Sequence, residues 1–224
     1  MPVHRLEQSI VIIADPFSPD ILSHAWLAGL GVIPKGPTPQ GSTYTDGISN
    51  TVMPEFTLLA VRNRIQFSIS CKAEQPERLI KGKLCPVINA LPQVPYKAIG
   101  FNFAFCAVPR TGGISAVTRR LFFSPDNRLL KHFDEPEAEF GTFASRDWRD
   151  LRLHLDVKPG RVDSTSFKGA ALLFLFNFHK DLPGESRSAE DSIAGEIEKI
   201  LALWEEAAGE SEKLVNVFKE EFAS

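Results

Sequence analysis

The spacing of apolar residues in the first half of the chain predicts four strands. Residues 8–14 are a β-branched run typical of a buried strand. Residues 64–71 alternate apolar and polar positions, as a strand with one buried and one wet face does. Comparable patterns predict strands at 52–62 and 96–107.

Two helices are predicted between these strands. Ser18-Pro19-Asp20 is typical of a helix start, and apolar spacing continues from it to Gly29. The second helix is expected over 75–91, where Pro86 should bend it or split it in two. The order β-α-β-β-α-β is that of a ferredoxin-like unit. Residues 33–50, rich in Pro, Gly, Ser and Thr, are expected to form a long loop.

The second half has a less regular pattern. A short helix is expected at 125–133, and two amphipathic helices, 188–207 and 211–222, are expected to close the chain. Strands are expected near 115–123, 138–144, 149–157 and 166–179.

These elements together predict an α+β fold in three parts. Residues 1–110 form the ferredoxin-like half, residues 111–184 a second β-rich half, and residues 185–224 acidic helices packed on the body. Two short strings recur in the same order: FSPD at 17–20 and 123–126, and FNF at 101–103 and 176–178. We interpret them as traces of an internal duplication. The alternative is that Ser-Pro-Asp commonly starts helices and that Phe is abundant here.

The strands with FNF predict the candidate binding residues. Within 98–107 and 171–180, phenylalanines occupy one face, and the other face carries an amide, Asn102 or Asn177, among small or apolar residues. Unpaired buried amides cost about 1–3 kcal/mol each, so both must be bonded. They either stabilise the sheet or form the polar floor of a ligand pocket, with His179 at the strand's end and the 33–50 loop as its cap.

Composition narrows the class of protein. The 224 residues are 43% hydrophobic, and 17 are Phe, which suits a large, well-filled interior. The formal net charge is -3, which argues against a protein that mainly grips nucleic acid without specificity. Residues 185–224 carry 11 acidic and four basic side chains, so acidic helices are expected as a solvated face or as a shield over a basic body.

Cysteine usage and hydropathy bear on location. Three scattered cysteines, Cys71, Cys85 and Cys106, are too few for a disulfide framework. No segment approaches the roughly 20 apolar residues of a membrane helix, and the N-terminus lacks a secretory pattern. A cytoplasmic protein is expected.

Motifs with a known mechanism are largely missing from the sequence. It contains no phosphate-binding glycine loop, no metalloprotease motif and no nucleophile elbow, and we expect no metal and no cofactor. Arg110-Thr111-Gly112-Gly113 could hold an anion or simply form a turn. Gly100-Phe101-Asn102-Phe103 resembles the RNA-recognition motif in part only, because its last aromatic is one position off and its strand is the fourth of the unit, so we assign no family.

The leading hypothesis is therefore a non-catalytic binding or assembly protein that acts through contacts with a protein partner or in a homo-oligomer. One alternative is a small-molecule-binding protein or enzyme whose pocket uses Asn102, Asn177 and His179, with Arg110 as a further binding residue. Another is a nucleic-acid-binding module. The sequence alone identifies neither substrate nor partner nor oligomeric state.

Overall fold

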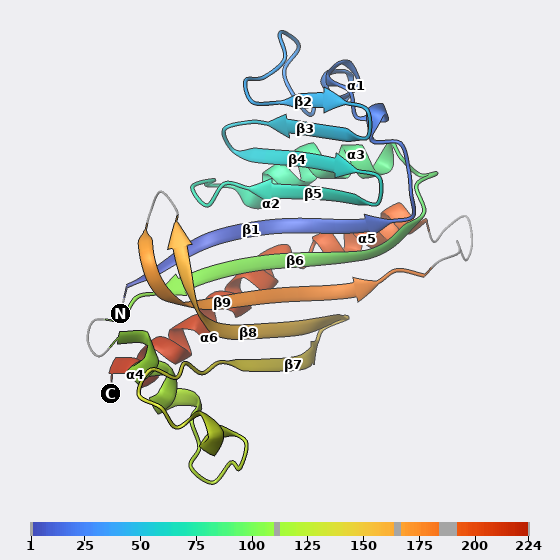
Figure 1. Cartoon of the computed structure of the whole chain (residues 1–224). Helices are drawn as coiled ribbons and strands as arrows, with labels where there is room; N and C mark the ends of the chain where they lie inside the picture. Colours follow the sequence, from blue (N-terminus) through green and yellow to red (C-terminus); the bar gives the residue numbers. More distant parts are fainter. Residues whose placement is uncertain (1, 110–112, 164–166, 184–191, 224) are drawn as a thin grey trace. The chain divides into compact units, whose positions relative to one another are not determined.

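The fold is α+β and is built on a large antiparallel sheet (Figure 1). The computed structural model describes residues 2–109, 113–163, 167–183 and 192–223. Nine strands follow one another in the order β2-β3-β4-β5-β1-β6-β9-β8-β7. The strands are β1 (Val3–Ala14), β2 (Thr43–Thr45), β3 (Ile48–Val52), β4 (Phe56–Val61), β5 (Arg64–Ile69), β6 (Tyr96–Ala107), β7 (Thr142–Trp148), β8 (Leu151–Asp163) and β9 (Lys168–Asp181).

The chain divides into two compact units, each made of separate stretches of sequence. Unit 1 comprises Met1–Leu6, Phe103–Asn177 and Glu210–Ser224, and unit 2 comprises Glu7–Asn102 and Phe178–Gly209. The bounds expected from the sequence, at 110 and 184, remain a prediction.

Unit 2 buries one face of β1, β4 and β5. Ile10 pairs with Phe67, and Phe67 pairs with Leu58, so these three side chains form a row across the strands. All three are at most 1% exposed. Such a row exists because side chains of antiparallel neighbours in register lie on the same face. The helices of this unit are η1 (Pro19–Ile21), α1 (His24–Gly29), α2 (Pro76–Leu79), α3 (Cys85–Asn89) and α5 (Ile193–Leu201).

The helix expected at 75–91 is present as one helical segment with an altered middle. Between α2 and α3, the turn η2 (Ile80–Leu84) is a π-helix, in which the N–H of Cys85 bonds the carbonyl of Ile80. Pro86 follows directly and has no N–H to donate. A wider π turn directly before Pro86 is consistent with the missing backbone N–H of this proline. Turns of this kind often accompany functional sites.

Unit 1 packs aromatic rings around the end of the last helix. The ring of Phe218, on α6 (Trp204–Ala223), lies 5.1 Å from that of Phe174 and 6.4 Å from that of Phe122. A smaller cluster joins Cys106 to Val162 and Ala171 of the β8–β9 hairpin. Burial raises the pKa of the Cys106 thiol.

Two sequence expectations are wrong. The strand expected at 115–123 is the helix α4 (Gly113–Phe122), in which Ile114 and Thr118 are buried one helical turn apart. Helical spacing therefore outweighs the β-branched composition of this stretch. The loop expected at 33–50 contains β2 and the start of β3, joined by a turn in which Gly47 has φ of 77°.

The remaining elements differ mainly in their limits. The short helix expected at 125–133 is η3 (Leu130–Phe133), and the closing helices meet near residue 203 rather than 209. Residues 96–107 form β6 as expected. Phe101 is fully buried, with its ring 5.3 Å from that of Trp204, so it is not available to stack on a base.

Candidate binding site

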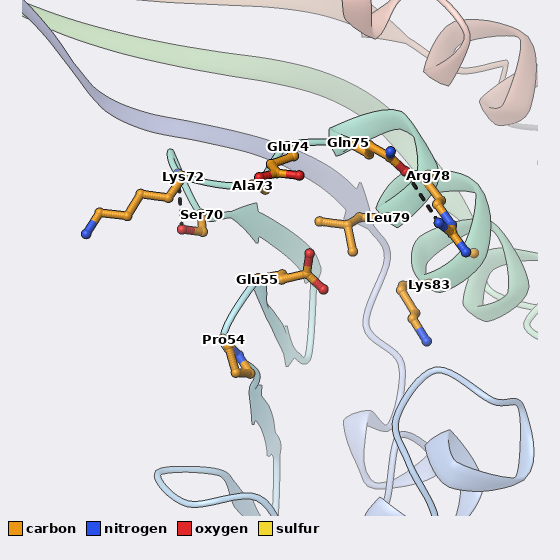
Figure 2. Close-up of a pocket in the computed structure, with 11 residues that line it drawn as sticks. Pro54, Glu55, Ser70, Lys72, Ala73, Glu74, Gln75, Arg78, Leu79 and Lys83 are labelled. Atoms are coloured by element: carbon orange, nitrogen blue, oxygen red, sulfur yellow. Dashed lines mark hydrogen bonds between the residues drawn. The ribbon is translucent and has the colours of Figure 1, made fainter.

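A hollow of about 860 Å3 opens in unit 2 beside the helical segment 76–89 (Figure 2). We call it the basic hollow. Three parts of the chain form it: the turn before β4, the turn after β5, and one side of the helical segment. Its lining residues are Pro54, Glu55, Ser70, Lys72, Ala73, Glu74, Gln75, Arg78, Leu79, Gly82 and Lys83.

Backbone hydrogen bonds centred on Ser70 fix the two turns. The N–H of Ser70 donates to the carbonyl of Glu55 at 2.8 Å, and the N–H of Ala73 donates to the carbonyl of Ser70 at 2.9 Å. The Gln8 side-chain amide, which is 2% exposed, also donates to that carbonyl at 2.8 Å. Because a buried amide is stabilised by a hydrogen bond, this bond favours one position of the turn. The hollow therefore has a preformed floor.

The positive charges of the hollow come from Lys72, Arg78 and Lys83. Figure 2 shows Lys72 on one side and Arg78 and Lys83 on the other, with Glu55 between them. Arg78 makes a single long bond of 3.4 Å to the Gln75 side chain, and Lys83 Nζ donates to the carbonyl of Gly31 at 2.9 Å.

None of these three cations forms a salt bridge with a carboxylate in the part of the chain that the structure describes. Two other cations of unit 2 are paired with a carboxylate: Lys97 lies 3.0 Å from Asp15, and Lys180 lies 2.7 Å from Glu196. Cations around one depression attract a carboxylate and can donate charge-assisted hydrogen bonds to it. The hollow thus carries three positive charges that no described carboxylate neutralises.

A second hollow, of about 470 Å3, lies on the other side of the same helical segment and reaches α5. We call it the acidic hollow. Glu198 accepts a bond of 2.7 Å from the Asn89 amide. Burial, and then the charge of Glu198, raise the pKa of the Cys85 thiol. Its lining residues are Glu77, Ile80, Lys81, Cys85, Glu198, Leu201, Ala202, Trp204 and Glu205.

Of the binding residues expected from the sequence, the three that the structure describes line neither hollow. Asn102 is on β6 in unit 2 and Asn177 is on β9 in unit 1. Both are half-buried, and neither is without a partner. His179 Nε2 lies 3.0 Å from Asp181 Oδ1. Arg110 falls outside the described residues, and a binding role for these four residues remains a prediction.

The segment expected to cap a pocket is hydrogen-bonded to η1 and to the residue that follows it. Ser49 Oγ donates to the carbonyl of Leu22 at 2.6 Å, and the N–H of Gly47 donates to Asp20 at 3.2 Å. Tyr44 and Thr51 join their hydroxyls at 2.8 Å. These contacts give the β2–β3 hairpin a structural attachment.

Among the described residues, no group of three or more His, Cys, Asp or Glu side chains could hold a metal ion. No described helix has the length and apolar content needed to cross a membrane.

The residues of the basic hollow were not predicted from the sequence. Lys72, Arg78 and Lys83 have no motif spacing, and the turns that complete the hollow adjoin different strands. The one local signal is Pro86, which marks the altered turn beside it. The chain matches no known family model, no curated protein and no solved structure.

Proposed function

We propose that this protein is a non-catalytic binding protein that recognises an acidic segment of a protein partner in the basic hollow. The observation that carries the proposal is the set of three cations without salt bridges around one preformed depression. Carboxylates of a partner segment would supply the missing counter-charges.

The form of the hollow favours a peptide over a small molecule. Sites for small molecules are mostly apolar and enclose most of the ligand surface. Here the lining is mainly polar, and Lys72, Glu74 and Arg78 are exposed. An extended polar segment can lie in such an open hollow and keep contact with water. The carboxylates Glu55 and Glu74 add selectivity, because they repel an acidic ligand in the wrong register.

The arrangement also favours binding over catalysis. General acid–base chemistry needs a donor and an acceptor within hydrogen-bond reach of a reacting group. The side chains of Glu55 and Glu74 make no hydrogen bond to a residue that the structure describes, and the bond from Arg78 to Gln75 joins no acid to a base.

The test is fluorescence anisotropy with a labelled peptide of alternating Glu and Gly. The wild-type protein is expected to bind it with an affinity that falls as salt rises. Arg78→Glu should weaken binding by about tenfold or more, about 1.4 kcal/mol. Lys81→Glu is the matched control, since Lys81 lies on the same helical segment but lines the acidic hollow.

An equal loss of peptide affinity in the two variants would contradict the proposal, because it would show that the peptide responds to the net charge of the protein and not to the basic hollow. If a labelled single-stranded RNA binds more tightly than the peptide, with the same dependence on Arg78, the partner is a nucleic acid and not an acidic peptide. Displacement of the peptide by inorganic phosphate at micromolar concentration would replace it by a small anion.

The finer points of the fold are part of this proposal. A ferredoxin-like arrangement is supported by the order β4-β5-β1-β6 and by the antiparallel pairing of β5 with β1 and β4. A duplication has weaker support, since the first FSPD string precedes a helical turn after β1 and the second follows α4. A cytoplasmic location is supported by three cysteines without disulfides.

A further inference from the structure

The nine-stranded sheet ends in β7, and no strand of the described residues lies on its outer side. β7 is seven residues long, and within the described ranges its one partner strand is β8. Ordinary protection of a sheet edge consists of Pro, a bulge, a short strand or free charges. Residues 142–148 contain no Pro and no Gly. The charges are already paired, Arg146 with Glu210 and Asp147 with Arg152.

The hairpin turn identifies the backbone groups on the open side. Two residues, Arg149 and Asp150, connect Trp148 to its partner Leu151, and Arg149 has φ of 52°. In a two-residue hairpin the flanking residues form a hydrogen-bonded pair, and such pairs alternate along the ladder. The N–H and C=O groups of Ala144 and Arg146 therefore bond to β8.

Phe143, Ser145 and Asp147 occupy the intervening positions, so their N–H and C=O groups point outward. None of the three has a backbone hydrogen bond to another described segment. The side chain of Phe143 is 65% exposed, and its ring centre lies 5.5 Å from that of His154. The side chains of Ser145 and Asp147 each accept a hydrogen bond from Arg152 of β8, at 2.7 and 2.8 Å.

We propose that β7 pairs in antiparallel orientation with β7 of a second copy of this chain, about a two-fold axis at Ser145. In this register Phe143 faces Asp147 of the second copy, and Ser145 faces its own equivalent. All three outward residues are used, and up to about six main-chain hydrogen bonds form.

The sequence of β7 suits this register and opposes the adjacent ones. On the other face, Ala144 lies opposite Arg146 of the second copy, where the small side chain leaves room for the long one. An axis at Arg146 would bring two arginines together at a close, non-hydrogen-bonded position, which is destabilising. An axis at Ala144 would leave Asp147 without a partner. The self-complementarity favours a second copy over an unrelated strand.

Sedimentation velocity from about 1 to about 100 μM tests the proposal, a range that covers typical reversible dimers. Ser145→Pro removes an outward N–H and places the ring where the second strand would lie, without touching the β7–β8 ladder. It should raise the dissociation constant more than about tenfold and leave the circular dichroism spectrum unchanged. Ser145→Ala, which keeps the N–H, should dimerise like the wild type.

A wild-type protein that stays monomeric overturns the proposal, as does a folded Ser145→Pro variant that still dimerises. If Ser145→Pro does not fold, oxidation of Ser145→Cys in a Cys71→Ser background decides. Only a residue on the axis faces itself at about 5.5 Å between Cα atoms, within reach of a disulfide. A covalent dimer with Ser145→Cys and none with Asp147→Cys supports the register, and any other result contradicts it. Binding at the basic hollow does not depend on this outcome.

Discussion

The two hollows lie on opposite sides of one helical segment and differ in how their charges are used. In the basic hollow, the cations have no carboxylate partner among the described residues, and the walls are mostly exposed. In the acidic hollow, Glu198 is bonded to Asn89, and Ile80 and Trp204 are 3% exposed or less. The first has cations near solvent without a counter-charge, and the second lies between packed helices. We therefore chose the candidate site by the pairing of its charges and the exposure of its walls, more than by its volume.

The largest effect on stability should come from truncating a buried side chain that lines the acidic hollow. Trp204→Ala removes a side chain that is 2% exposed and packs edge-on against Phe101. The free energy of unfolding should fall by about 3–5 kcal/mol, which lowers the melting temperature by roughly 10 °C for a chain of this size. Differential scanning calorimetry measures it. Val217→Ala, at a position 47% exposed, is the control and should change little. A small loss in Trp204→Ala would show that this wall is not part of the core.

Removing the carboxylates should sharpen the basic hollow as an anion site. Glu55→Gln combined with Glu74→Gln deletes the repulsion but keeps the size of both side chains. Affinity for the acidic peptide should rise roughly three- to tenfold, because each exposed like charge costs up to about 1 kcal/mol. Glu77→Gln with Glu205→Gln, in the acidic hollow, is the matched control. An equal rise in both double variants would mean that the peptide senses net charge alone.

A smaller effect is expected at Gly82, which lines the basic hollow. A Cβ added there meets no atom within 4 Å. Gly82→Ala should therefore stabilise the helical segment by about 0.5–1 kcal/mol, through lower entropy of the unfolded chain, without weakening peptide binding. Gly141→Ala gives the contrast, since its Cβ would lie 2.6 Å from the carbonyl oxygen of Val157. Urea denaturation compares them, and destabilisation by Gly82→Ala would contradict the expected fit.

The subtlest difference concerns the pH dependence of the Cys85 thiol. Burial and Glu198 both disfavour the thiolate and raise this pKa, so reaction with a maleimide should begin at higher pH than for an ordinary thiol. Glu198→Gln removes one of these causes and should move the onset toward lower pH. Because the pKa of the Cys85 thiol is higher in the folded than in the unfolded state, the thiol contributes to the free energy of unfolding below its unfolded-state pKa. This contribution is lost as the pH rises through its folded-state pKa. An unchanged onset would show that Glu198 does not act on the thiol.

Strong local patterns in the sequence predicted parts of the fold correctly. The limits of β6 follow from a long apolar run in which both faces are buried. The β2–β3 hairpin was missed although Asp46-Gly47 between two Thr-containing runs is a known hairpin signal. The abundance of Pro and Gly around it outweighed that signal. In α4 the buried positions repeat with a helical period, but the β-branched residues of this segment favour a strand and so led to the wrong prediction.

The candidate site was beyond local patterns. Lys72, Arg78 and Lys83 are ordinary surface residues until the turn at Ser70 is bonded to Glu55 and Gln8. Those bonds connect β1, β4 and β5, and their register is a property of the whole sheet. The amides at Asn102 and Asn177 were predicted to have partners, and neither is without one. The alternation of side chains between the two faces of a strand shows that a buried amide needs a hydrogen-bond partner, but it does not show whether that partner is a ligand.

The discontinuous make-up of the two units has a consequence for biosynthesis. Unit 1 takes its first strand residues from Met1–Leu6 and its last helix from Glu210–Ser224, and unit 2 needs Phe178–Gly209 to be complete. No single cut releases either unit whole. On the ribosome, the early strands must therefore wait for distant partners, with their apolar faces exposed, until nearly the entire chain has emerged. We expect a chain that is cut short before Phe178 to leave both units incomplete.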